Sequence, residues 1–303
     1  MHRPAKRSWL VALWGCGLVA AAGADPPPAR IAITVDDLPW LQQAGRSGGE
    51  LEATERILSA LKEQGAPATG FVVCDRIGEH EPTLRRWLDD GMTLGNHSAG
   101  HRDLNRAEIE LWLDDVRRCD QRLRAIVGRP VRFFRFPMLH QGATIEKRDA
   151  ALALLERLDY RIAHVSVDNS DWILGRAYAG ALARGDAAAQ ASIGRRFVAH
   201  ILDAVRHYQG IARSKLGRDL DHVLLLHATE LVADHLTALL EELSRAGFEF
   251  ISLEEALREP AYHLPDGYLG PKGLSWLYRM APATPEGAAW DDQQAQLIGG
   301  QVM

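Results

Sequence analysis

The sequence lacks the short glycine-rich motifs that mark the common nucleotide-binding enzymes. It contains no Walker phosphate loop and no Gly-x-Gly-x-x-Gly. It has no internal repeat. Cysteine is scarce, with three residues in 303 and no zinc-finger spacing. Histidine is plentiful by comparison, with 12 residues.

An excess of positive charge is absent as well. The 35 lysines and arginines are outnumbered by 40 aspartates and glutamates, which gives a net charge of −5. Such a chain has no general attraction for nucleic acid or for anionic lipid. We therefore expect no nucleic-acid partner.

A short apolar run lies near the N-terminus. Arg3, Lys6 and Arg7 precede apolar residues from Trp9 to Ala22, a run that is too short for a comfortable membrane span. Small residues for cleavage follow in Ala22-Gly23-Ala24. This order is typical of a secretory signal peptide over residues 1–24.

Cleavage would leave Asp25 as the first residue of the mature chain. That chain has 32 basic and 40 acidic residues and a net charge of −8. We expect export to the periplasm or the extracellular space, without stable membrane insertion after cleavage. A lipoprotein anchored through Cys16 and an uncleaved anchor are the alternatives. An oxidising compartment would permit a bridge between Cys74 and Cys119, but two buried free thiols fit the sequence equally well.

Strand-like and helix-like segments alternate along the chain, in a composition that is 47% apolar and 25% charged. The expected strands are 30–35, 69–73, 92–94, 131–134, 160–167, 222–226 and 248–251. The expected helices are 50–64, 81–90, 106–127, 143–158 and 231–246, with an Ala-rich helix or helix pair within 176–220. This alternation predicts parallel strands joined by right-handed crossovers, so that all strand carboxyl ends lie on one face.

Two histidines, His97 and His101, follow the strand 92–94. Residues four apart lie on one face when the backbone between them makes a helical turn, so the pair can offer two imidazole nitrogens to one divalent ion. The spacing alone is weak evidence, because surface or helix-capping histidines share it. A catalytic ion usually takes three protein ligands and leaves a position open for water. A third ligand must therefore come from another segment.

Two adjacent acids, Asp36 and Asp37, end the first strand. Carboxylates at the end of a buried strand are costly unless something compensates for their charge. Neighbouring strand residues point in opposite directions. One carboxylate can therefore bind an ion while the other, turned aside by the exit of the chain, faces a reacting water. A helix-capping or turn pair is the alternative, but the next helix begins only near Gly49.

Three later strand ends also carry polar residues. Arg135 follows 131–134 between aromatic residues, which indicates burial and a guanidinium that can hold a carboxylate ionised; a surface ion pair is the alternative. Asp171 and Trp172 follow 160–167, and His227 ends 222–226. A hydrogen-bonded core residue is the alternative for His227. All five strand ends meet on one face of the predicted topology, which favours one shared site.

The order of these motifs is Asp-Asp, His-x-x-x-His, Arg-x-Pro, Asp-x-x-Asp-Trp and Leu-x-Leu-His over residues 30–255. It resembles the polysaccharide deacetylase family, the NodB-homology or carbohydrate esterase 4 group. The resemblance implies an α/β fold, a distorted (β/α) barrel with its site at the carboxyl ends of parallel strands. It also implies that Asp37, His97 and His101 hold one divalent metal ion, for which we expect Zn²⁺.

The same resemblance implies four catalytic residues. Asp36 corresponds to the base and Arg135 to the residue that orients it. His227 corresponds to the general acid, and Asp171 to the residue that tunes this histidine.

Three further residues are expected to contact the substrate or its oxyanion: Met138, His140 and Trp172. Met138 stands where the family usually has a tyrosine whose backbone N–H helps to bind the oxyanion. Only the side chain differs here, so the N–H can still serve. The family's usual glycine after Asp-Asp is also replaced, by Leu38-Pro39-Trp40.

We therefore expect a signal peptide (1–24), a catalytic domain (25–258) and a Pro/Gly-rich C-terminal extension (259–303). The expected activity is metal-dependent removal of acetyl groups from N-acetylated sugars of a peptidoglycan- or chitin-like polysaccharide, through a metal-activated water. The alternatives are an O-acetyl esterase, an amidase acting on a small amide, and a glycan-binding homologue without catalysis.

Overall fold

A computed structural model describes residues 28–41 and 49–301 of the chain. The signal peptide predicted for residues 1–24, with the alternative lipid site at Cys16, lies outside the described residues.

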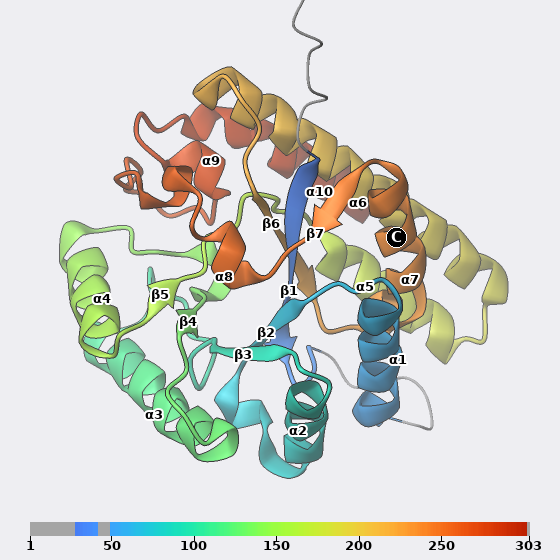
Figure 1. Cartoon of the computed structure of the whole chain (residues 1–303), viewed down its shortest axis with the longest axis horizontal. Helices are drawn as coiled ribbons and strands as arrows, with labels where there is room; N and C mark the ends of the chain where they lie inside the picture. The colour runs from blue at the N-terminus through green and yellow to red at the C-terminus, as the bar shows by residue number, and fades with distance from the viewer. Residues whose placement is uncertain (1–27, 42–48, 302–303) are drawn as a thin grey trace, which may run out of the picture.

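Seven parallel strands form one curled sheet in the described part of the chain (Figure 1). In order across the sheet they are β5 (Arg161–Ile162), β4 (Phe133–Phe134), β3 (Thr93–Asn96), β2 (Ala68–Val72), β1 (Ala29–Leu38) and β6 (His222–His227). The short strand β7 (Phe248–Phe250) pairs with the first residues of β1.

An irregular segment after β5 connects the two edges of this sheet. The N–H of Val167 donates to the carbonyl oxygen of Val223 at 3.0 Å, and the N–H of Leu225 donates to that of Val167 at 3.2 Å. The strand expected over 160–167 is therefore two residues long, and the rest of that segment crosses from β5 to β6. The prediction of a distorted (β/α) barrel is confirmed.

Ten α-helices are described around the sheet. They are α1 (Gly49–Glu63), α2 (Glu81–Asp89), α3 (Ile109–Val127), α4 (Ile145–Arg157), α5 (Asp171–Ala183), α6 (Ala187–Leu216), α7 (Glu230–Arg245), α8 (Leu253–Ala256), α9 (Trp276–Arg279) and α10 (Ala289–Gln301). Helices α1, α7, α6 and α5 pack in succession on one side, and α2, α3 and α4 lie around the other (Figure 1). Within these described residues, we find no helix with the length and apolar character needed to cross a membrane.

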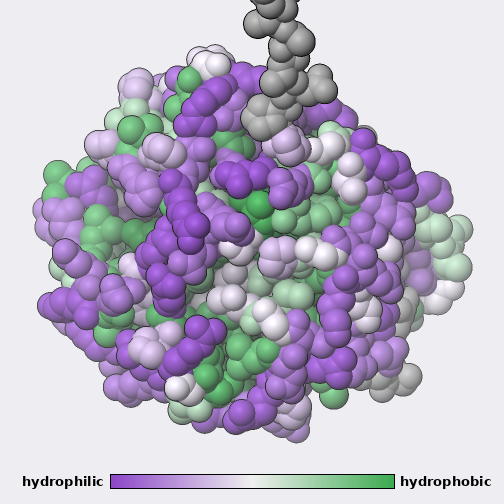
Figure 2. All heavy atoms as spheres, viewed as in Figure 1, coloured by the Kyte–Doolittle hydropathy of each residue, from purple (hydrophilic) through white to green (hydrophobic). Residues whose placement is uncertain are grey.

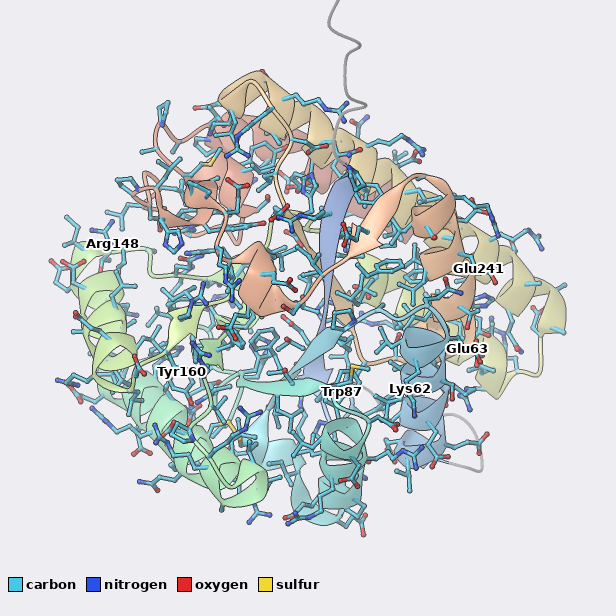
Figure 3. All side chains as sticks on the ribbon, viewed as in Figure 1. Lys62, Glu63, Trp87, Arg148, Tyr160 and Glu241 are labelled. Carbon is cyan, nitrogen blue, oxygen red and sulfur yellow. A yellow bond between two sulfur atoms is a disulfide. The ribbon has the colours of Figure 1, made fainter. Side chains whose placement is uncertain are left out.

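The apolar residues of the strands and of one face of each long helix form the core. In β1 every residue from Ile31 to Leu38 is buried, as expected for a parallel strand covered on both faces. Trp87 of α2 points toward the sheet (Figure 3), and its Nε1 donates to the carbonyl oxygen of Thr93 at 3.0 Å. Charged and polar residues cover most of the molecular face shown in Figure 2, with apolar residues in smaller patches.

The C-terminal extension is folded against the barrel. The N–H of Trp276 donates to the carbonyl oxygen of Val165 at 2.6 Å, and Oγ of Ser275 donates to that of Ser166 at 2.8 Å. Lys215 of α6 donates to the carbonyl oxygen of Leu277 at 2.8 Å. The extension therefore packs on the segment that joins β5 to α5.

Candidate active site

Asp36 and Asp37 lie at the carboxyl end of β1, where the strand is irregular. The pairing of β1 with β6 places Asp36 opposite His227, while the register with β2 shifts between Val35 and Leu38. Asp37 has φ of 68°, in the left-handed region that aspartate tolerates better than most residues. This irregularity breaks the strand alternation, and both carboxylates line one cleft at the mouth of the barrel.

Asp37, His97 and His101 form a potential metal site. Each offers one ligand atom, and the three atoms lie within 4.8 Å of one another. Nε2 of His101 lies 3.5 Å from Oδ1 of Asp37. The predicted helical turn between the histidines is wrong: Ser98 and His101 have φ of 63° and 52°, so a left-handed loop brings the two imidazoles together.

Hydrogen bonding and burial prepare these imidazoles to act as ligands. Nδ1 of His97 donates to the carbonyl oxygen of Arg135 at 2.8 Å, which leaves the lone pair of Nε2 for a metal. Burial lowers the pKa of His97 and of His101 and so favours the neutral ring. Burial opposes ionisation of Asp37, but its neighbours His97, His101, His227 and Arg76 outweigh burial and lower its pKa. Two neutral imidazoles and one carboxylate fit a divalent ion.

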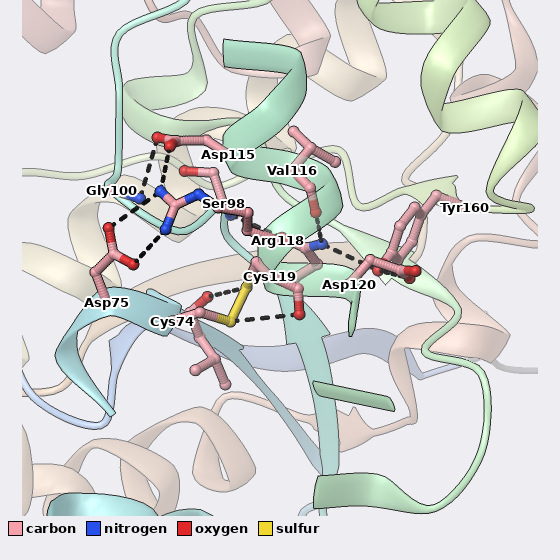
Figure 4. Close-up of a disulfide and its surroundings, with 12 residues drawn as sticks. Cys74, Asp75, Ser98, Gly100, Asp115, Val116, Arg118, Cys119, Asp120 and Tyr160 are labelled. Atoms are coloured by element: carbon pink, nitrogen blue, oxygen red, sulfur yellow. Dashed lines mark hydrogen bonds and ion pairs between the residues drawn. A yellow bond between two sulfur atoms is a disulfide. The ribbon is translucent and has the colours of Figure 1, made fainter. Parts of the chain in front are cut away.

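The loop between the two histidines is held by a neighbouring disulfide (Figure 4). Cys74 is bonded to Cys119 of α3, so the question that the sequence left open is answered in favour of a bridge. The N–H of Cys74 donates to the carbonyl oxygen of Ser98 at 3.2 Å, and the N–H of Asp75 donates to that of Ala99 at 3.0 Å. The disulfide therefore joins α3 to the backbone that supports the histidine loop.

Asp36 is buried beside Arg135. Nη1 of Arg135 lies 3.4 Å from Oδ2 of Asp36, and its Nη2 donates to Oγ1 of Thr34 at 3.1 Å. Burial raises the pKa of Asp36 to about 6, against the opposing effect of Arg135. Oδ1 of Asp36 is buried without a hydrogen-bond partner among the described residues. This oxygen can therefore accept a proton in the cleft.

His227 and Asp171 form a close pair, and His227 is the β6 residue that lies opposite Asp36 of β1. Nδ1 of His227 lies 2.6 Å from Oδ1 of Asp171, and the backbone N–H of His227 donates to Oδ2 at 2.8 Å. Burial disfavours the charged ring, but Asp171 outweighs this effect and raises the pKa of His227 to about 9. Asp171 was expected to close a strand; instead it is the first residue of α5.

The cleft has a volume of about 560 Å³. It is lined by Asp36, Asp37, Leu41, His97, His101, Met138, Leu139, Asp168, Asn169, Ser170, Trp172, Arg176, Leu225 and His227. Arg135 and Asp171 lie behind this wall and contact Asp36 and His227. His140 is not among the lining residues, and its Nδ1 lies 2.7 Å from Oδ1 of Asp103.

Met138 lies in a left-handed turn at the edge of the cleft, with φ of 55°. The N–H groups of Leu139 and His140 donate to the carbonyl oxygens of Phe136 and Pro137, both at 3.0 Å. The C-terminal extension supports this turn from behind. A Cβ atom on Gly273 would lie 1.9 Å from the carbonyl oxygen of Met138, so only glycine allows this close approach.

Three charged residues of the site were not predicted: Arg76, Asp168 and Arg176. Arg76 donates through Nη1 to Oδ1 of Asp37 at 2.9 Å. Asp168 lines the cleft, and burial raises its pKa to about 6. Arg76 follows β2 by four residues, at the same end of the barrel as the other site residues. A search for charged residues just after β2, like the search made after the other strands, would have identified Arg76.

Comparison with known proteins agrees with this geometry. The family model for polysaccharide deacetylase matches residues 23–162. These residues belong to the polysaccharide deacetylase family. They include both acids, both metal-site histidines, Arg135 and Met138, whereas Asp171 and His227 lie beyond them.

Two curated relatives are peptidoglycan-N-acetylglucosamine deacetylase of Bacillus cereus and chitin deacetylase of Colletotrichum lindemuthianum. The first is 26% identical over 144 residues, which is 48% of this chain and 46% of the relative. The second is 27% identical over 150 residues, which is 48% of this chain and 54% of the relative. The chain thus spans about half the length of these relatives.

The fold is also that of BA3943 of Bacillus anthracis, which is described as a CE4 family pseudoenzyme. The two chains share 18% identity with a TM-score of 0.53, over 77% of this chain and 66% of BA3943. This similarity concerns the fold alone. Evidence for catalysis must come from the residues of the cleft.

Proposed function

We propose that this protein is a metal-dependent deacetylase that removes acetyl groups from N-acetylated sugars of a polysaccharide of the peptidoglycan or chitin type. The observation that carries the proposal is that one cleft brings together a buried carboxylate, Asp36, an imidazole, His227, and the three residues of the potential metal site. Asp36, with a pKa of about 6, is ionised at neutral pH, whereas His227, with a pKa of about 9, is protonated. A base and an acid are therefore ready at the same pH.

Asp37, His97 and His101 are the residues that would hold the ion, and we propose Zn²⁺ because two imidazoles and one carboxylate suit it. When bound, such an ion supplies Lewis-acid polarisation of the acyl carbonyl and lowers the pKa of water. Arg76 and the backbone of the histidine loop hold these three side chains in place.

Asp36 takes the proton of the attacking water through its unpartnered Oδ1, while Arg135 holds the carboxylate in position. The backbone N–H of Met138 donates to the oxyanion, because the next two N–H groups already bind within the turn. His227 then protonates the departing amine through Nε2, with Asp171 fixing its tautomer. The products are a free amine and acetate.

An imidazolium acid favours an amide over an ester as the substrate. An amine leaves poorly unless it is protonated, whereas an alkoxide or phenoxide depends less on an acid. The paired His227 and Asp171 therefore support N-deacetylation over O-acetyl esterase activity, and the complete set of base, acid and metal-site residues argues against a purely glycan-binding role.

We further propose that residues 25–258 carry the catalytic machinery and that the extension 259–303 supports it, since Gly273 packs against Met138. Trp172 is proposed to contact the sugar, because it lines the cleft and is exposed. Export to the periplasm or the extracellular space is part of the proposal, and the disulfide supports it because such bonds persist in oxidising compartments.

Acetate release tests this function. The purified mature chain would be incubated with chitin oligosaccharides, peptidoglycan and acetylated xylan, with Zn²⁺ and with a chelator. We expect acetate and free amine from at least one N-acetylated glycan, and loss of both products with the chelator. Release from acetylated xylan alone would establish an esterase, and no release from any substrate by metal-loaded protein would contradict the proposal.

A further inference from the structure

Arg176 lies in the wall of the cleft, one helical turn after Trp172 on α5. Its guanidinium carbon lies 5.4 Å from the centroid of the Trp172 ring, a cation–π contact. The indole is itself 39% exposed. The contact orients a flexible, exposed arginine on a rigid ring, so less side-chain entropy is lost when its N–H groups bind a partner.

No carboxylate of residues 28–41 and 49–301 forms an ion pair with this guanidinium. The acids that line the cleft, Asp36, Asp37 and Asp168, have other neighbours. Arg176 is also the only arginine or lysine among the residues that line the cleft. The wall therefore carries one permanent cation whose hydrogen-bonding edge is not used within the described protein.

The proposed ion and the protonated His227 serve the reacting acetamide, so neither is free to pair with a carboxylate elsewhere on the glycan, and the three acids of the cleft would repel that carboxylate. An acidic substrate can be accepted only where a cation faces its charge, and the planar guanidinium matches a carboxylate in two parallel hydrogen bonds. A neutral polymer would need no such group. Arg176 thus distinguishes between two classes of N-acetylated glycan.

We propose that Arg176, held by Trp172, forms a subsite for a carboxylate carried by the substrate, so that the preferred substrate is an acidic N-acetylated glycan. This inference rests on the proposed deacetylase function and adds the chemical class of its substrate. Arg176 acts in binding and leaves the acid and base of the reaction unchanged.

The test compares two oligosaccharides of equal length: a neutral N-acetylglucosamine oligomer, and one in which alternate sugars carry a lactyl-ether carboxylate. KM for acetate release is measured for the natural protein and for Arg176→Gln, Arg176→Lys and Arg184→Gln. The last variant is the matched control, because Arg184 follows the same helix, does not line the cleft and loses the same charge.

For the natural protein we expect KM to be about tenfold lower for the acidic oligosaccharide. This ratio corresponds to the binding free energy of one charge-assisted hydrogen-bonded contact. Arg176→Gln should bring the ratio close to one, Arg176→Lys should restore part of it, and Arg184→Gln should leave it unchanged. A ratio near one in the natural protein, or an unchanged ratio in Arg176→Gln, would overturn the subsite.

Calorimetric binding of the same two oligosaccharides to each protein separates this inference from the function on which it rests. If neither compound releases acetate, the proposed function fails for them. A tenfold binding preference that disappears in Arg176→Gln would still support the subsite. Equal binding of both oligosaccharides by the natural protein would rule it out, whatever the outcome for catalysis.

Discussion

Nη1 of Arg76 lies 2.9 Å from Oδ1 of Asp37, the same oxygen that faces Nε2 of His101 at 3.5 Å. A permanent cation thus contacts the carboxylate that is proposed to bind a divalent ion. Its charge repels that ion, and its hydrogen bond competes for the ligand oxygen. We therefore expect Arg76 to weaken metal binding while it holds Asp37 ionised.

Arg76→Gln should accordingly bind Zn²⁺ more tightly, by about fivefold if the partly exposed ion pair contributes about 1 kcal/mol. Competition with a chromophoric chelator measures the dissociation constant. Arg85→Gln is the control, since this arginine pairs with Glu81 on α2. Weaker binding by Arg76→Gln would mean that orientation of Asp37 outweighs charge repulsion.

Removing either proposed imidazole ligand should remove the ion. We expect about one metal ion per natural chain, and loss of both metal and activity in His97→Ala and in His101→Ala. His140→Ala is the matched histidine control, because His140 pairs with Asp103 away from the cleft wall. Elemental analysis by mass spectrometry gives the metal content, and circular dichroism checks the fold. Full metal content in either ligand variant would disprove the assignment.

The disulfide should affect the metal as well as stability. Replacing both cysteines, in Cys74→Ser with Cys119→Ser, removes a link that closes about 45 residues, for which chain entropy predicts a loss of about 4 kcal/mol. We expect the Zn²⁺ dissociation constant to rise by about tenfold as well, because Cys74 and Asp75 bind the backbone of the histidine loop. Affinity is measured well below the melting temperature of the variant. A lower melting temperature with unchanged affinity would limit the disulfide to a stabilising role.

Strand ends were the part of the site that the sequence predicted well. Alternating segments implied parallel strands, and parallel strands place their carboxyl ends together, so Asp36, His97 and His227 could be expected in one cleft. The structure places all three among the lining residues. Arg135 was expected to be partly buried and is 1% exposed.

Local conformation was less predictable, because it depends on contacts between distant segments. The left-handed backbone at Ser98 is held by Cys74, which is 24 residues earlier in the chain. Asp171 begins a helix because the segment after β5 leaves the sheet to meet β6. His140 faces Asp103, a pairing that no local sequence pattern indicates.

The pH dependence of catalysis follows from the two perturbed pKa values. Asp36 works as a base only when deprotonated, so the rate should rise with pH through about 6. His227 works as an acid only when protonated, so the rate should fall through about 9. Initial rates of acetate release between pH 4.5 and 10 (about the range that brackets both groups) should give a bell-shaped curve.

Replacing the base should remove the acidic limb of this curve. Asp36→Asn should keep its metal and lose about 10²–10⁴-fold in rate, the usual contribution of base catalysis. Asp168→Asn is the comparison, since Asp168 also lines the cleft and has a raised pKa but lies outside the proposed proton path. An Asp36→Asn enzyme with full activity, or a flat profile for the natural enzyme, would contradict the acid–base scheme.

His227 should matter most for substrates with a poor leaving group. His227→Ala should reduce the rate on an N-acetylated sugar by about 10²–10⁴-fold, since a general acid contributes that much, and it should affect an activated aryl acetate far less. Asp171→Asn should show the same preference more weakly. It should also move the alkaline limb to lower pH, because loss of the Asp171 carboxylate removes the main cause of the raised pKa of His227. Rates on both substrates across pH measure these effects, with His207→Ala as a control histidine that lies outside the cleft wall and forms a hydrogen bond with Tyr278. Equal losses on the amide and the ester would mean that His227 positions the substrate and that the proton reaches the amine from another group.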